Sequence, residues 1–111
     1  METTRQKKID RLLQKELGEI FQRQTQSLGG VLISVSRVRI SPDLSSARVY
    51  LSIFPSERGE EMLEAVRQNT SAIRFDLGNR TRHQLRIIPE LKFFIDDSID
   101  YLEHIDELLR K

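Results

Sequence analysis

Basic side chains in two separate segments are the strongest candidates for chemistry in this sequence, and the chemistry that they favour is the binding of phosphate. The first segment carries Arg5, Lys7, Lys8, Arg11 and Lys15. The second carries Arg74, Arg80, Arg82 and Arg86. Acids gather instead at 57–64 and 96–107, so a formal net charge of only +1 conceals an uneven distribution. A molecule with one positive and one negative side suits a polyanionic partner.

The arginines of the second segment rank first as ligands of a nucleic-acid backbone, because the planar fork of a guanidinium group pairs with phosphate. The ordinary alternative is a solvated helix face with ion pairs to the acids at 57–64. Arg80 ranks last of the four, since its spacing from Ile73 and Leu77 places its stem near the apolar side of a helix. The first segment would supply either a second track of phosphate contacts or mere solubility.

The sequence gives little support to catalysis by a nucleophile or to metal binding. The sequence has no cysteine, which excludes disulfide scaffolds, thiol catalysis and thiolate metal sites. His83 and His104 are not spaced as metal ligands, and the acids Asp96 and Asp97 are expected at a helix start from capping alone. We therefore expect no catalytic residue, no metal and no cofactor.

The elements that must position the basic groups begin with a hairpin at 38–50. Pro42 fixes a turn-compatible φ, while Asp43 and Ser45 can hydrogen-bond nearby backbone N–H groups. Apolar residues alternate cleanly in the second strand. In the first strand the alternation changes phase between Val35 and Val38, which predicts either burial on both faces or a bulge near Ser36. Arg37, Arg39 and Arg48 flank this hairpin and rank third as phosphate ligands.

Helical spacing of apolar residues predicts a first helix from about 4 to 25, with Thr3 and Gln6 as a capping box. A second helix starts after Pro55 with Ser56 as its N-cap. The poor helix formers Asn69, Thr70 and Ser71 predict a kink, after which a third helix continues until Pro89 closes it.

A short strand follows at 91–95, and an acidic last helix occupies about 98–111. The predicted order is α-β-β-α-kink-α-β with a short C-terminal helix. The aromatic residues Tyr50, Phe54 and Phe94 share one strand phase, and we expect that face to pack against helices. Recognition by shape and phosphate contact is therefore favoured over stacking on bases.

The 111 residues suffice for one domain with one core, 1–111, and no signal peptide or membrane span is evident at the start. We expect a cytoplasmic protein, monomeric when free, with no membrane partner.

The chain resembles the ribosome-binding factor A family in four places along nearly its whole length. They are the hairpin around Ser41-Pro42-Asp43-Leu44, the run Ile73-Arg74 with Leu77-Gly78, the run Pro89-Glu90-Leu91-Lys92-Phe93, and His104-Ile105 with Leu108-Leu109. Together these motifs are specific. The family usually shows Ala-x-Gly at the kink, where this sequence has Asn69-Thr70-Ser71.

The resemblance implies an α+β type II KH-like domain with a three-stranded sheet packed against helices. It also implies a non-catalytic assembly factor that binds the immature small ribosomal subunit and its 16S rRNA precursor and assists late 16S rRNA maturation. Two alternatives from other classes remain. One is a protein-binding adaptor that uses the acidic last helix. The other is a small α+β hydrolase that holds an anion with Asn79 and Arg80, although a Gly-rich anion loop and a paired nucleophile and base are missing.

Overall fold

The first helix, α1 (Thr4–Thr25), begins at the predicted capping box. In this computed structural model, which describes residues 3–26 and 30–96, the Thr3 hydroxyl accepts a hydrogen bond of 3.1 Å from the Gln6 N–H, and the Gln6 side-chain carbonyl accepts one of 2.8 Å from the Thr3 N–H. The two bonds satisfy N–H groups that a helix start leaves without partners. The buried side of α1 carries Ile9, Leu13, Leu17, Ile20 and Phe21.

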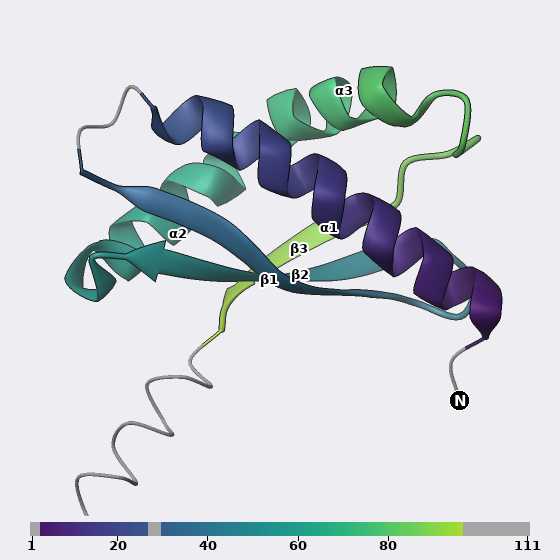
Figure 1. Cartoon of the computed structure of the whole chain (residues 1–111), viewed down its shortest axis with the longest axis horizontal. Coiled ribbons are helices and arrows are strands. Elements are labelled where there is room, and N and C mark those ends of the chain that lie inside the picture. The colour runs from purple at the N-terminus through teal and green to yellow at the C-terminus, as the bar shows by residue number, and fades with distance from the viewer. Residues whose placement is uncertain (1–2, 27–29, 97–111) are drawn as a thin grey trace, which may run out of the picture.

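Below α1 lies a three-stranded sheet (Figure 1). Its strands β1 (Leu32–Ile40), β2 (Ser46–Phe54) and β3 (Glu90–Ile95) follow one another in the order β1-β2-β3. The β1–β2 pair is antiparallel and the β2–β3 pair is parallel, so the chain crosses over between β2 and β3. The helices of the crossover therefore pack on one face of the sheet.

The turn between β1 and β2 is held by backbone and side-chain bonds. The Leu44 N–H donates to the Ser41 carbonyl over 2.9 Å, and Leu44 adopts a φ of 63°. Asp43 Oδ1 accepts from the Ser45 N–H, as predicted. Ser45 itself differs from the prediction, because its hydroxyl donates to Asp43 over 2.7 Å, and the Ser41 hydroxyl accepts from the Ser46 N–H instead.

The change of phase in β1 is a bulge. Val35 pairs with Leu51 and Arg37 pairs with Tyr50, which leaves Ser36 as the additional residue on β1. The Gln14 amide donates to the Val35 and Ser36 carbonyls, and the Ser36 hydroxyl donates to Asp96 Oδ2 over 2.6 Å. The bulge lets apolar residues on both sides of Ser36 face the helices, so burial on both faces is not needed.

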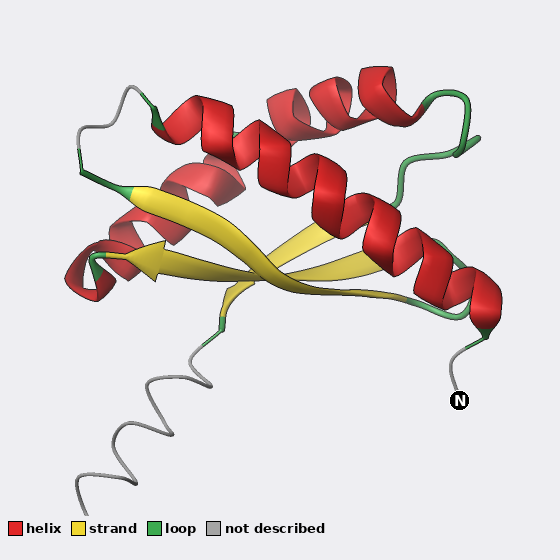
Figure 2. Ribbon diagram, viewed as in Figure 1, coloured by secondary structure: helices red, strands yellow, loops and turns green. Residues whose placement is uncertain are grey.

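Only one face of the sheet is covered by helices of the described residues (Figure 2). In β2 the buried residues are Ala47, Val49, Leu51 and Ile53. The expectation that the face with Tyr50, Phe54 and Phe94 packs against helices is wrong, because these side chains alternate with the buried set and lie on the opposite face. Phe54 and Phe94 are exposed.

After β2 the chain forms a short 3₁₀ turn, η1 (Ser56–Arg58), before α2 (Gly59–Gln68). Ser56 is therefore not the N-cap of the second helix, since the 3₁₀ turn intervenes and Arg58 occupies that position. The helix α3 (Thr70–Thr81) follows directly.

The predicted kink between the second and third helices is a break at Asn69, whose φ of −100° and ψ of 13° differ from helical values. A negative φ of this kind requires no glycine. The hydroxyl that bonds local backbone belongs to Thr70, which donates to the Arg67 carbonyl over 2.7 Å, whereas Ser71 is exposed in the first turn of α3.

The third helix ends at Thr81, eight residues before Pro89, and the prediction that Pro89 closes it is wrong. The Gln84 and Leu85 N–H groups both donate to the Thr81 carbonyl over 2.8 Å, which closes one last turn beyond the helix. Arg82 is the C-cap, and Arg86 lies in the connection to β3.

The order α-β-β-α-α-β makes this an α+β fold of type II KH topology, as predicted. Its core lies between the sheet and the helices, where Phe21 and Phe93 meet edge to face with ring centroids 6.0 Å apart. The predicted acidic helix at about 98–111 lies outside the described residues. Among the helices described, none has the length and apolar character needed to cross a membrane.

Candidate nucleic-acid interface

The predicted phosphate ligand Arg74 contacts the protein's own backbone. Its Nη2 donates to the Ile88 carbonyl over 2.7 Å, and its Nε donates to the Pro89 carbonyl over 3.3 Å. These bonds join α3 to the connection 82–89. Arg74 thereby positions the segment that carries Arg86.

Arg80 forms ion pairs that join α3 to α1. Its Nη1 lies 2.7 Å from Glu19 Oε2 and 3.2 Å from Glu16 Oε2, and its Nε lies 3.8 Å from Asp76 Oδ1. Partial burial alone would lower the pKa of the Arg80 guanidinium, but the bonds to Glu16 and Glu19 and the charge of Asp76 raise it above its ordinary value. The fork is thus directed at carboxylates of the same molecule.

Cations from both predicted segments meet in one cavity of about 730 Å³. Arg5 and Lys8 enter it from the first turns of α1, and Arg86 enters it from the connection 82–89. The turn residues Asp43 and Ser45 form another wall. Groups that are about 80 residues apart in sequence therefore share one concave, cationic site.

The other predicted cations are exposed around this cavity or along α1. Lys8, Arg11 and Lys15 follow one another at spacings of three and four residues and so share one side of the helix. Lys7 is exposed on the first turns, and Arg82 is exposed at the end of α3.

The carboxylate of Asp43 accepts hydrogen bonds from the turn between β1 and β2. Hydrogen bonds from the Ser41 and Ser45 hydroxyls and from the Ser45 N–H lower the pKa of Asp43 from 3.8 to about 2. The contribution of these bonds to stability is complete above about pH 4 and is lost as the pH falls toward 2, because the native carboxylate must then be protonated.

An Asp43→Asn variant should therefore unfold at a lower temperature than the wild type above pH 4, and the difference should vanish as the pH approaches 2. Thermal unfolding followed by circular dichroism between pH 2 and pH 6 measures this. A difference that stays constant over the range would contradict the assignment.

The chain is similar along almost its whole length to proteins of one family. The family model Ribosome-binding factor A matches residues 5–109. The Flavobacterium johnsoniae ribosome-binding factor A is 52% identical over 111 residues, which are 98% of this chain and 85% of that protein. The protein of the same name from Christiangramia forsetii is 48% identical with the same coverage. This chain belongs to the ribosome-binding factor A family.

Solved structures of family members share the fold. The crystal structure of Thermus thermophilus ribosome-binding factor A superposes with a TM-score of 0.67 at 27% identity, covering 81% of this chain and 94% of that chain. A homology model of the Thermus thermophilus protein, fitted into the cryo-EM map of a 30S–ribosome-binding factor A complex, gives the same TM-score at 28% identity and covers 79% and 91% of the two chains.

The joint between α2 and α3 contains no glycine, so side chains and not bare backbone are presented to a ligand there. Asn69 and Ser71 are exposed there, and Thr70 is half-buried. A glycine would let backbone approach a phosphate closely, which side chains at these positions hinder.

The described residues also contain no cluster of three His, Asp or Glu side chains that could hold a metal ion.

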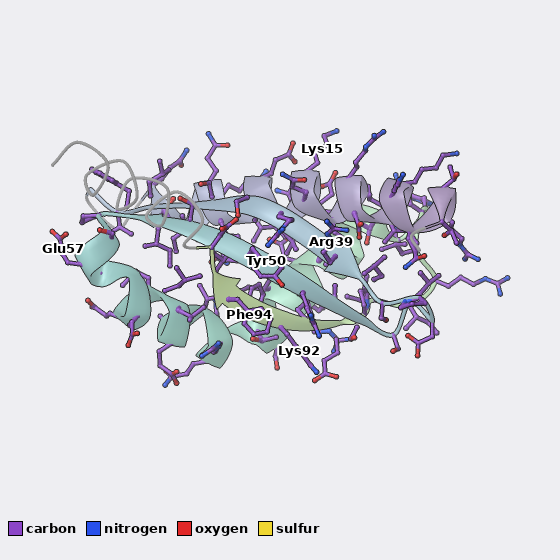
Figure 3. All side chains as sticks on the ribbon, turned by 90° about the horizontal axis from the view of Figure 1, so that it is seen from below. Lys15, Arg39, Tyr50, Glu57, Lys92 and Phe94 are labelled. Carbon is purple, nitrogen blue, oxygen red and sulfur yellow. The ribbon has the colours of Figure 1, made fainter. Side chains whose placement is uncertain are left out.

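The sequence analysis left Lys92 out of the candidate ligands and assigned Phe94 to a face packed against helices, whereas both lie on the sheet face that no helix of the described residues covers (Figure 3). The same face carries Arg39 and Tyr50, while Lys15 lies on α1 at its border and Glu57 lies at a distant end of the molecule. The two-residue period of a strand was the available signal, because it assigns Lys92 and Phe94 to the face opposite Leu91 and Phe93.

Proposed function

We propose that this chain is a non-catalytic assembly factor that binds the immature small ribosomal subunit and assists late maturation of its 16S rRNA. It acts as a cytoplasmic monomer, and residues 1–111 form one RNA-binding domain. Family membership supports the ribosomal partner, and a relative from Thermus thermophilus is described in a complex with the 30S subunit.

The observation that carries the proposal is the shared cavity of Arg5, Lys8 and Arg86. Three cations from two elements around one concavity can contact successive phosphates of a folded RNA backbone. Lys7, Arg11, Lys15 and Arg82 extend the cationic surface on either side, and Arg74 and Arg80 act by positioning α3 and its connection. The RNA is held by its charge and shape, and no bond is made or broken.

Removing two cavity arginines should weaken binding and reduce its dependence on salt. For the pair Arg5→Ala and Arg86→Ala, we expect the slope of log affinity against log salt concentration to fall by about 1.4 to 1.8 units, because two phosphate contacts are lost. Co-sedimentation with immature small subunits at several salt concentrations measures both quantities, and mature subunits and whole ribosomes measured alongside test the preference for the immature particle.

The matched control is the pair Arg23→Ala and Arg58→Ala, which removes two guanidinium groups from the last turn of α1 and from η1. The control should change the slope far less. Equal changes in the two pairs would assign the effect to net charge alone, and an unchanged slope in the cavity pair would remove this cavity from the interface.

A further inference from the structure

The uncovered face of the sheet carries two rows of side chains that run across all three strands. The register places Arg39 opposite Arg48 and Arg48 opposite Lys92. The next row consists of Arg37, Tyr50 and Phe94. The rows are two residues apart on β2 and β3, a distance of about 6.6 Å along a strand.

The first row is cationic from edge to edge. Side chains directly opposite each other on neighbouring strands lie about 5 Å apart, and like charges at this distance destabilise a sheet. The directly opposed Arg48 and Lys92 therefore repel each other in the isolated protein, and a bound polyanion would offset the repulsion. Two acids lie at the ends of this face: Glu90 is the first residue of β3, and Asp96 follows its last residue. The centre of the face is therefore positive.

The second row is an aromatic platform. The Tyr50 and Phe94 ring centroids lie 5.7 Å apart with a tilt of 31°. The Arg37 guanidinium lies 4.4 Å from the Tyr50 ring centroid, as in a cation–π contact. Phe94 is 36% exposed on a face that no helix of the described residues covers. An exposed aromatic ring beside a guanidinium group is an arrangement on which unpaired bases stack, and the half-buried Tyr50 supports both groups from the side of the sheet.

We propose that this face binds a short single-stranded segment of RNA. The bases stack on Phe94 and on the Arg37 guanidinium that lies over Tyr50, and the phosphates lie against Arg48 and Lys92, with Arg39 in the same row. The surface is distinct from the cavity of Arg5, Lys8 and Arg86, and the proposal rests on the proposed function only for the class of ligand. A double-stranded RNA offers no free base to the platform, so the face selects unpaired nucleotides.

The test measures fluorescence anisotropy of a labelled single-stranded RNA decamer that cannot pair with itself, with the same sequence as a duplex for comparison. Phe94→Ala should lower affinity for the single strand by about 5-fold to 150-fold, which is the loss expected for one stacked base. Phe94→Tyr should retain affinity, and Phe94→Leu should not, because leucine keeps apolar area without an aromatic face. The pair Arg48→Ala and Lys92→Ala should lower the salt slope by about 1.4 units.

Equal binding by the wild type and by Phe94→Ala, or by Phe94→Leu and Phe94→Tyr, would overturn the proposal. Unchanged decamer binding together with weaker binding of Phe94→Ala to whole small subunits would also overturn it, and would indicate a ribosomal protein on this face. The Arg5→Ala and Arg86→Ala pair separates the two surfaces. Loss of subunit binding in that pair with intact decamer binding would support the platform independently of the cavity.

Discussion

Replacing Phe93 by alanine is expected to lower the free energy of unfolding by about 3 to 5 kcal/mol. The side chain is 2% exposed and packs edge to face against Phe21 at the centre of the core. Truncation removes buried apolar area and leaves a cavity that a close-packed core fills only in part. Since domains of this size are stable by only about 5 to 15 kcal/mol, equilibrium unfolding in urea will show the loss clearly.

The neighbouring residue Phe94 is the matched control, because it is the same residue type on the same strand and faces the other way. Phe94→Ala should cost less than about 1 kcal/mol, the range of a single cross-strand pair on an exposed face. Equal losses at the two positions would mean that the sheet does not have one buried and one open face.

Replacing Arg80 by alanine should be the second large effect, with a loss of about 2 kcal/mol or more. The Arg80 side chain is 17% exposed and its partner Glu16 is 15% exposed, so removal of the arginine leaves a carboxylate with little access to water. Breaking a fully buried pair from one side costs about 3 to 5 kcal/mol, and partial access to water reduces that value here. Urea unfolding of the variant measures the loss.

Arg82→Ala provides the comparison on the same helix end, where an exposed arginine near the C-terminus contributes below about 1 kcal/mol. In an Arg80→Ala background, Glu16→Gln should cost less than it does in the wild type, because its partner is already absent. Additive losses for Glu16 and Arg80 would show that the two side chains do not interact.

Local signals in the sequence were sufficient to predict most helices and strands, but they did not predict which side chains contact each other. Thr3 and Gln6 are three residues apart and cap α1 by themselves, and the two phases around Ser36 indicated a bulge as one of two options. Arg80 is different, because its partners Glu16 and Glu19 are more than 60 residues away. No spacing rule relates such positions, so the ion pairs become visible only when α1 and α3 pack together.

The predictions of where α3 ends and of which face of the sheet the helices cover were wrong for related reasons. Pro89 marks a limit beyond which a helix cannot continue, but the helix ends eight residues earlier, at Thr81, which three exposed residues follow. Aromatic residues such as Tyr50 and Phe94 are common on a buried face, yet the helices cover the face opposite them. Alternation identifies which residues share a face and does not say which face is covered.

The additional residue at Ser36 has a consequence for how this chain can change through time. Because the side-chain period of a strand is two, deleting Ser36 would remove the bulge and leave a regular strand, in which Val38 and Ile40 still face inward and Arg37 and Arg39 still face outward. Deleting a residue from the regular part of the strand, such as Val38, would instead exchange the faces of the residues after it, bringing Arg39 inward and Ile40 outward. Position 36 is therefore the place in β1 where the chain can lose one residue and keep its arginines on the outer surface.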